Sequence, residues 1–96
     1  IRKVFGVCAK EIFVSSCKSQ LGHMLGAAGA VEAAVTTLSL YRDTLVPTIN
    51  LEHADPACEL NHVTSVMKKE IRLAMTNSFG FGGVNAVLVL KKFMNS

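Results

Sequence analysis

Residues 18–41 read KSQLGHMLGAAGAVEAAVTTLSLY, and this stretch decides the fold. Small residues recur in it at helical spacing and form one stripe: Gly22, Gly26, Gly29, Ala33 and Thr37. Such a stripe lets another backbone approach closely. Glycine costs about 1 kcal/mol relative to alanine inside a helix, so tight packing has to offset Gly26 and Gly29. Because the other faces are apolar as well, the pattern predicts a helix from His23 to Tyr41 that is buried on nearly all sides.

Upstream of this helix, the sequence predicts the end of another helix and one strand. Residues 1–5 finish a helix with Gly6 as its C-terminal cap. Residues 11–16, EIFVSS, contain an apolar run that suits a short strand buried on both faces. Lys18 to His23 then form the loop that leads into the long helix.

Downstream, a long loop precedes two strands. Residues 42–66 contain two prolines and predict irregular structure, of which 46–51 can run extended. Two apolar strands are expected at 71–76 and 84–90. Between them the glycine-rich segment 77–83, NSFGFGG, predicts a bend that pairs the strands antiparallel.

Length and composition indicate a part of a larger assembly. A chain of 96 residues makes one domain at most. Only 18% of its residues are charged, whereas a free-standing small domain carries roughly 25–35% charge on its surface. The first residue is Ile. We therefore expect a chain cut from a longer one, with much of its surface covered by another part.

Several functional classes find little support in the sequence. The net charge is +3, and the one basic cluster, at 68–72, has no interleaved aromatic residues, so we expect no nucleic-acid binding, although an acidic protein partner stays open. Residues 21–40 imitate a membrane span, but Glu32 near their middle makes a buried protein helix the better interpretation. Three cysteines without CxxC spacing favour neither disulfides nor zinc and fit a reducing compartment. We expect no metal and no cofactor.

Two residues around the loop carry candidate chemistry. His23 is placed at the N-terminus of the predicted helix, where the positive end of the dipole favours a neutral imidazole that can donate a hydrogen bond to a developing oxyanion. A capping or core histidine is the alternative. Lys18 follows the predicted strand, and sites in α/β folds gather at such carboxyl ends. It can tune His23, or it can be a surface lysine.

The bend at 77–83 is the third candidate. Its glycines permit backbone angles that turn N–H groups inward and form an oxyanion hole, although a plain hairpin turn has equal weight. The segment matches neither a Walker loop nor a dinucleotide fingerprint. A dyad of Cys17 with His23 is disfavoured because Cys17 continues a buried strand, and Cys8 and Cys58 offer less.

Together these segments resemble the β-ketoacyl synthases. KSQLGHMLGAAGA at 18–30 resembles their K-x-x-x-G-H-x-x-x-A-x-G motif, VPTINL at 46–51 resembles PPTxNL, and NSFGFGGVN at 77–85 resembles NSFGFGGxN. The order and spacing agree over residues 11–92. The match is greatest with the single-chain elongating synthases of type II fatty-acid synthesis, and ketosynthases of polyketide pathways are the near alternative.

The resemblance implies an α/β fold of the thiolase type, with layered α-β-α-β-α architecture. Residues 1–96 would be the C-terminal part of the synthase C-terminal domain: a strand, a buried helix, a long loop and two antiparallel strands, with the upstream half missing. The implied reaction is a decarboxylating Claisen condensation of an acyl thioester with malonyl-acyl carrier protein. The implied partner is acyl carrier protein carrying malonyl and acyl groups, in a homodimeric enzyme. An intracellular location follows, either the bacterial cytoplasm or alternatively the mitochondrial matrix or plastid stroma.

The resemblance also assigns roles to residues. His23 matches the second catalytic histidine and Lys18 the lysine. Phe79 matches a phenylalanine that gates the acyl pocket and contributes its N–H to the oxyanion hole. Gly80 gives that ring a flexible neighbour, and the loop is supported by Asn77, Phe81, Gly82 and Gly83.

Two features depart from the family pattern. The family's nucleophilic cysteine and first histidine have no matching segment here, so the chain alone is expected to be inactive. Val46 replaces the first proline of the usual pair, which we expect to loosen that loop. A non-catalytic interaction module and an unrelated glycine-rich anion-binding domain remain as competing readings.

Overall fold

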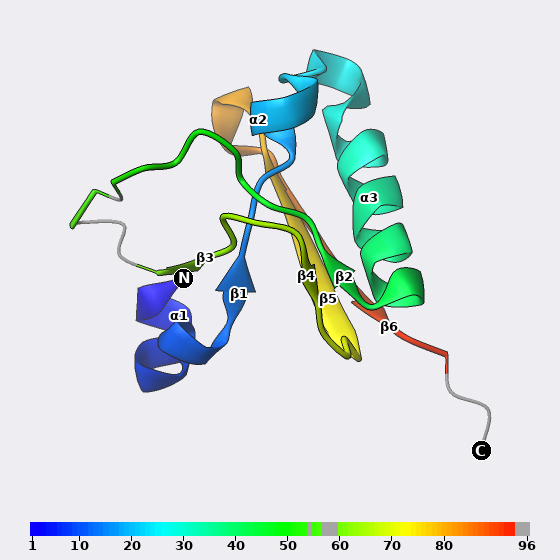
Figure 1. The fold of residues 1–96 in the computed structure, drawn as a ribbon. Coiled ribbons are helices and arrows are strands. Elements are labelled where there is room, and N and C mark those ends of the chain that lie inside the picture. The colour runs from blue at the N-terminus through cyan, green and yellow to red at the C-terminus, as the bar shows by residue number, and fades with distance from the viewer. Residues whose placement is uncertain (54, 57–59, 94–96) are drawn as a thin grey trace. The chain divides into compact units, whose positions relative to one another are not determined.

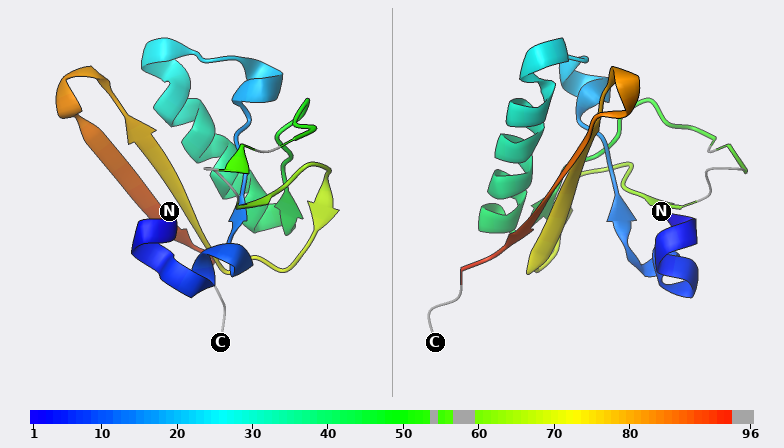
Figure 2. Two further views of the ribbon diagram at one scale, coloured as in Figure 1. Left: turned by 90° about the vertical axis from the view of Figure 1, so that its left-hand side faces the viewer. Right: turned by 180° about the vertical axis from the view of Figure 1, so that it is seen from behind.

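The protein forms two compact units, which are described one at a time. Its structure is a computed structural model that describes residues 1–53, 55–56 and 60–93 (Figures 1 and 2). Unit 1 comprises Ile1–Gly22 and Val46–Met67, and unit 2 comprises His23–Leu45 and Lys68–Ser96.

Unit 1 is built from short elements around a small core. They are α1 (Arg2–Phe5), the 3-10 helix η1 (Gly6–Glu11), β1 (Phe13–Val14), α2 (Lys18–Leu21) and β3 (Asn61–His62). β1 and β3 are parallel, with Phe13 opposite Asn61 and Val14 opposite His62. The buried residues of this unit are Ala9, Pro47 and Val63.

The predicted upstream elements are confirmed in kind but not in length. α1 ends at Phe5, and Gly6 follows with a φ of 57°, as expected of a C-terminal glycine. The strand covers Phe13–Val14 instead of residues 11–16, because Glu11 ends η1 and Ser15 and Ser16 bond to side chains. The region 42–66, predicted to be irregular, contains two-residue strands that are too short to show a periodicity.

Unit 2 consists of one helix packed on a hairpin. Its elements are η2 (Leu25–Ala27), α3 (Ala28–Arg42), β2 (Thr44–Leu45), β5 (Leu73–Phe79), η4 (Phe81–Gly83) and β6 (Asn85–Lys91). β2 pairs with β4 (Met67–Lys68). The boundary between the two units falls within β4. β5 and β6 pair antiparallel from Leu73 opposite Lys91 to Phe79 opposite Asn85, which confirms the predicted hairpin.

The close backbone approach expected along the small-residue stripe is not found at Gly22 or Gly26, where an added Cβ atom would have no neighbour within 4 Å among the residues that the structure describes. At Gly29 the neighbour is a side chain at an ordinary van der Waals distance. A Cβ atom placed on Gly29 would lie 3.4 Å from Ser78 Oγ, so the first turn of α3 lies directly against the end of β5. Side chains alternate along β5, with Ala74, Thr76 and Ser78 less exposed than their neighbours. The face of the hairpin that carries these three residues is therefore the one that packs on α3.

The long helix begins five residues later than predicted. α3 starts at Ala28, and the preceding residues form a turn followed by the 3-10 helix η2. Gly22 and Leu25 have φ angles of 79° and 51°, which are incompatible with a right-handed helix. The bond from the Leu25 N–H to His23 Nδ1 competes with helix formation in the same way as a capping side chain.

The prediction of a helix buried on all sides is wrong for this chain by itself. Leu40 is the only buried residue of α3, and Ala30, Ala34, Leu38 and Tyr41 are exposed along it. No helix in the described part of the chain is both long and apolar enough to cross a membrane. The helix has the expected apolar composition, but the chain supplies cover for only one side of it.

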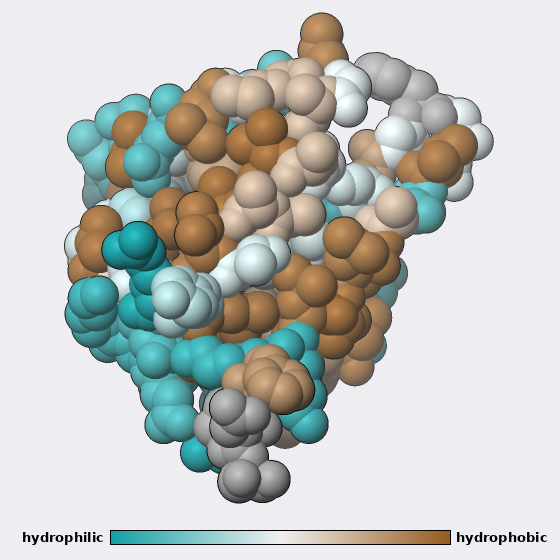
Figure 3. Space-filling view, turned by 90° about the vertical axis from the view of Figure 1, so that its right-hand side faces the viewer, coloured by the Kyte–Doolittle hydropathy of each residue, from teal (hydrophilic) through white to brown (hydrophobic). Residues whose placement is uncertain are grey.

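The far face of the hairpin is exposed as well. It carries five large apolar residues: Leu73, Met75, Phe79, Val87 and Val89. Figure 3 shows apolar side chains spread over the surface of the molecule. This confirms the expectation that the chain by itself leaves apolar surface uncovered, because a solvated sheet face normally carries polar residues.

Asp43 joins the C-terminal end of α3 to the hairpin. It caps the helix in a left-handed conformation, with φ 49° and ψ 47°. Its carboxylate accepts the Ile71 N–H at 3.0 Å and pairs with the Lys92 ammonium, while its carbonyl accepts the Lys69 N–H at 2.9 Å. The Lys92 ammonium first, and the Ile71 N–H second, hold the pKa of Asp43 below its ordinary value.

We predict that Asp43→Asn destabilises the protein in a pH-dependent way. Folding lowers the pKa of the Asp43 carboxyl, so the carboxylate stabilises the folded protein at pH values above the pKa of an unfolded Asp, about 3.9. That stabilisation is lost as the pH falls through the pKa of Asp43 in the folded state. Thermal unfolding of the longer protein that contains this chain, followed by circular dichroism, should show a lower Tm for the variant near neutral pH, with the difference shrinking in acid. Glu70→Gln is the control, since Glu70 and Arg72 form an exposed pair. A Tm difference that does not depend on pH would contradict the prediction.

We also predict that the 96-residue chain on its own self-associates and folds poorly. Its exposed apolar positions on the hairpin and α3 offer a large surface that water does not solvate well. Light scattering should show species larger than a monomer, and 8-anilinonaphthalene-1-sulfonate fluorescence should rise on mixing. A monodisperse monomer with cooperative unfolding would be the contrary result.

Candidate functional site

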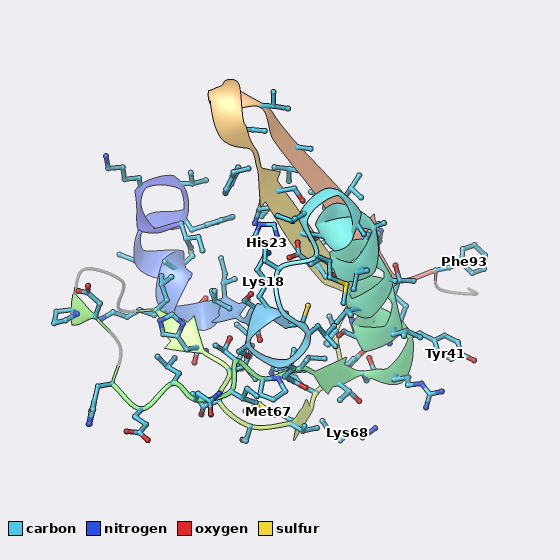
Figure 4. The ribbon with its side chains drawn as sticks, turned by 90° about the horizontal axis from the view of Figure 1, so that it is seen from above. Lys18, His23, Tyr41, Met67, Lys68 and Phe93 are labelled. Carbon is cyan, nitrogen blue, oxygen red and sulfur yellow. The ribbon has the colours of Figure 1, made fainter. Side chains whose placement is uncertain are left out.

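Lys18 begins the short helix α2 in unit 1 and is half-buried (Figure 4). Its N–H donates to Ser16 Oγ at 3.3 Å, and its carbonyl accepts the Gly22 N–H at 2.8 Å. The turn just before α2 and the glycine just after it therefore hold the backbone of Lys18 on both sides.

Side-chain hydrogen bonds tie this turn to the segment 46–49. Thr48 Oγ1 accepts the Ser16 N–H at 2.9 Å and lies 3.3 Å from Ser15 Oγ. Ser19 Oγ accepts the Ile49 N–H at 2.8 Å. The partners are about thirty residues apart in the sequence, so these bonds define the site as a tertiary arrangement and not as a local turn.

His23 is held in one tautomer by its own backbone turn. The Leu25 N–H donates to His23 Nδ1 at 3.0 Å, which requires Nδ1 to be unprotonated. The ring proton of this neutral imidazole then sits on Nε2. Leu25 adopts a left-handed φ of 51° to make this bond, a conformation that costs a non-glycine residue roughly 1–2 kcal/mol.

The physical reason given for a neutral His23 has to be corrected. The dipole argument placed His23 at a helix N-terminus, but α3 begins at Ala28, and the dipole field falls off within one turn of the helix end. The hydrogen bond from the Leu25 N–H indicates the tautomer of His23 from geometry instead. His23 remains the residue of this turn that can donate from Nε2 to an oxygen gaining negative charge.

The glycine-rich bend begins later than predicted. Asn77, Ser78 and Phe79 complete β5, and the turn itself runs through Gly80 and η4 into β6. The Gly80 N–H donates to the Val84 carbonyl at 2.6 Å and closes the bend, so an oxyanion would have to be held by another N–H.

The glycines of the bend differ in what they require. Gly80 is extended, with a φ of −109° that any residue adopts, although a Cβ atom there would contact the Val84 carbonyl at 3.4 Å. Gly82 and Gly83 have φ angles of 77° and 79°, where other residues are strained. The backbone freedom expected of the loop therefore comes from Gly82 and Gly83.

Phe79 projects from the end of β5 and is 73% exposed. Asn77 is exposed on the same face of the hairpin, because side chains two residues apart in a strand point the same way. The backbone of Phe81 begins η4, and its side chain lies outside the described part of the structure.

Within unit 2, the start of α3 and the glycine-rich bend lie at the same end, as all views in Figures 1 and 2 show. The contact of Gly29 with Ser78 fixes this arrangement. His23 precedes that helix start by five residues, and Phe79 ends the strand that Gly29 approaches. Lys18 belongs to unit 1 and is described with that unit.

Cys17 contributes to the start of α2 through its carbonyl, which accepts the N–H groups of Gln20 at 3.0 Å and Leu21 at 2.9 Å. Cys8 is exposed and Cys17 is half-buried, and both are free thiols. Cys58 lies outside the described residues. Among the residues that the structure describes, no cluster of three or more His, Cys, Asp or Glu side chains could hold a metal ion.

Sequence reasoning found the motif residues but missed those that hold them. Thr48, Ser16 and Ser19 were not predicted as site residues, and neither was the left-handed conformation of Leu25. A signal was present for the first three, because a cluster of hydroxyl side chains in so apolar a chain needs hydrogen-bond partners.

Comparisons with known proteins agree with the motifs. A family model described as "Beta-ketoacyl synthase, C-terminal domain" matches residues 1–52. Proteins named 3-oxoacyl-[acyl-carrier-protein] synthase 2 from Coxiella burnetii and Staphylococcus aureus are each 48% identical to this chain, over 93 and 94 residues. The protein of that name from Synechocystis is 45% identical over 94 residues. The matches cover 96–97% of this chain, which spans 22–23% of the length of those relatives.

Solved structures extend the likeness to the fold. One is a type II polyketide synthase acyl-carrier protein in complex with its ketosynthase bound to the hexaketide, with a TM-score of 0.93 and 33% identity over 97% of this chain and 23% of that one. The ishigamide ketosynthase/chain length factor gives 0.70 and 36%, over 72% of this chain and 17% of that one. The predicted α/β fold of the thiolase type is thereby confirmed. With the fold, the family model and the three motifs in agreement, the chain belongs to the β-ketoacyl synthase family.

Proposed function

We propose that this chain forms the C-terminal part of a 3-oxoacyl-[acyl-carrier-protein] synthase, called the intact synthase below. Residues 1–96 would belong to its C-terminal domain, with the upstream half supplied by the same protein. The names of the 45–48% identical relatives support fatty-acid synthesis as the pathway. The likeness to a type II polyketide ketosynthase makes polyketide synthesis the second candidate.

The proposed reaction is a decarboxylating condensation. The bond between the malonyl α-carbon and its carboxylate breaks, carbon dioxide leaves, and the electron pair passes to the thioester oxygen as an enolate. The enolate carbon then attacks an acyl thioester held on a cysteine outside this chain, and that cysteine leaves as a thiolate. Because the chain lacks this nucleophile segment, it would carry out no condensation by itself.

The bond between the Leu25 N–H and His23 Nδ1 is the observation that carries this proposal. It leaves a neutral imidazole with its proton on Nε2, which is the donor that an enolate oxygen needs. A donor fixed in place before the charge develops stabilises the transition state without a cost of reorganisation. His23 would therefore stabilise the enolate. Lys18 would tune and orient His23.

The glycine-rich bend would serve the acyl group. Phe79 would gate the acyl pocket and contribute its N–H to the oxyanion hole, and Gly80 would give it room to move. Asn77, Phe81, Gly82 and Gly83 would support the loop. The exposure of the Phe79 ring and the left-handed angles of the last two glycines are compatible with this role.

The partner of the intact synthase would be acyl carrier protein carrying malonyl and acyl groups. A related ketosynthase has been solved in complex with an acyl-carrier protein, which supports this choice. We further propose a homodimer, and, since the named relatives are bacterial, a location in the bacterial cytoplasm. A non-catalytic module is the competing proposal, and the experiments below distinguish it from a synthase.

We predict that His23→Ala in the intact synthase blocks malonyl decarboxylation but still allows acylation of the cysteine. Loss of one preorganised oxyanion donor costs roughly 100- to 1000-fold in kcat, and forming the acyl-enzyme does not need that donor. Carbon dioxide release from malonyl-acyl carrier protein and mass spectrometry of the acyl-enzyme measure the two steps. His53→Ala, in an exposed loop, is the control. Condensation by the His23 variant at a near-normal rate would refute the role.

Phe79→Ala should leave the fold intact and disturb the order of the two half-reactions. Within this chain the ring makes few contacts, and a gate that lacks it would no longer distinguish empty from acylated enzyme when malonyl-acyl carrier protein arrives. Pre-steady-state acylation and condensation are the measurements. Phe93→Ala, which removes another exposed ring, is the matched control. If both variants match the unsubstituted enzyme in both steps, Phe79 has no gating role.

A further inference from the structure

The segment 46–49 belongs to a family motif, yet none of its residues has a role in the proposed chemistry. Thr48 is its centre. Its Oγ1 accepts the Ser16 N–H at 2.9 Å and lies 3.3 Å from Ser15 Oγ. Ser16 in turn accepts the Lys18 N–H on its own Oγ at 3.3 Å. Thr48 is thus connected to the backbone of Lys18 through one intervening residue.

The hydroxyl protons around Thr48 have a consistent arrangement. The Ser15 hydroxyl donates to the Val46 carbonyl, so the Thr48 hydroxyl can donate to Ser15 Oγ at 3.3 Å or to the Ser16 carbonyl at 3.5 Å. Thr48 Oγ1 then has its lone pairs available for the Ser16 N–H. One hydroxyl at position 48 is used both as a donor and as an acceptor, which valine cannot reproduce and serine can.

Thr48 is itself fixed to the buried part of unit 1. Its N–H donates to the Val63 carbonyl at 2.8 Å, and the Val63 N–H donates to the Val14 carbonyl at 2.9 Å. Val63 is 2% exposed. The hydroxyl that holds Ser16 is therefore carried by a backbone that is anchored to the core, which is what a positioning group requires.

Two further bonds hold α2 from the same segment. Ser19 Oγ accepts the Ile49 N–H at 2.8 Å and donates to the Ser16 carbonyl at 3.3 Å. Gln20 Nε2 donates to the carbonyl of the buried Pro47 at 3.0 Å. Segment 46–49 consequently contacts the turn before Lys18 and the helix after it, and Lys18 lies between these two attachments.

We propose that Thr48 is a positioning residue that sets the place of Lys18 through Ser16. This inference rests on the proposed role of Lys18 in the condensation. Thr48 does not touch the substrate; it holds the turn from which the lysine extends. An error of about 1 Å in the position of a catalytic group can cost on the order of 100-fold in rate, so the hydroxyl at position 48 should affect kcat more than substrate binding.

The test compares Thr48→Val with Thr48→Ser in the intact synthase. Valine keeps the shape of threonine and loses the hydroxyl, so kcat for condensation should fall about 10- to 100-fold with little change in KM for malonyl-acyl carrier protein. Serine should restore most of the rate. Thr37→Val is the control, because the Thr37 hydroxyl bonds only to the Ala33 carbonyl within α3, and it should behave as the unsubstituted enzyme.

Combining Thr48→Val with Lys18→Ala separates positioning from a general loss of structure. If Thr48 acts through Lys18, Lys18→Ala alone slows the enzyme and adding Thr48→Val slows it no further. The inference would be overturned if the double variant had a lower kcat than Lys18→Ala alone. It would also be overturned if Thr48→Val had a normal kcat while Lys18→Ala had a reduced one. If Lys18→Ala had a normal kcat, the proposed role of Lys18 would be refuted. The inference depends on that role and would be refuted with it.

Ser16→Ala gives an independent reading if Thr48→Val reduces the yield of folded enzyme. It leaves Thr48 in place and removes only the oxygen that accepts the Lys18 N–H. The inference is supported if Ser16→Ala lowers kcat in the otherwise unsubstituted enzyme but lowers it no further when Lys18→Ala is already present. An unchanged kcat overturns it.

Discussion

The carboxylate of Asp43 sets the geometry of the helix and the hairpin in unit 2. The backbone of Asp43 caps α3, while its carboxylate accepts the Ile71 N–H just before β5 and pairs with Lys92 just after β6. The helix and both strands are thereby joined at one end. The opposite end, where Gly29 approaches Ser78, carries the turn of His23 and the glycine-rich bend. The candidate site loops of unit 2 and this ionic and hydrogen-bonded anchor therefore lie at opposite ends of the helix and the hairpin.

What the sequence could predict depended on features that recur within a short window. The hairpin was predicted correctly because two apolar runs flank a glycine cluster. The start of α3 was missed because it depends on the left-handed angle of Leu25 and on the bond to His23 Nδ1. Such a conformation is not favoured by leucine, so no propensity argument would have placed it there.

The residues of the candidate site also fall into those that could be predicted from the sequence and those that could not. Lys18, His23 and Phe79 were identified because each lies in a recognisable motif. Thr48 and Ser16 were not, because their contact joins residues 32 positions apart and leaves no periodic trace in the sequence. The burial of α3 was overestimated for a related reason: an apolar composition predicts that a helix will be covered, but it does not reveal whether the same chain provides the cover.

The hydrogen bonds of segment 46–49 also bear on how the chain tolerates changes in length. Ser16, Ser19 and Gln20 each meet a fixed partner between Pro47 and Ile49, so inserting or deleting a residue just before Pro47 would shift all three partners by one place. Glu52 and His53 follow that segment and are exposed. A peptide tag or spectroscopic label introduced at Glu52 or His53 should therefore leave the surroundings of Lys18 intact, which gives a practical handle on this family through its own connecting loop.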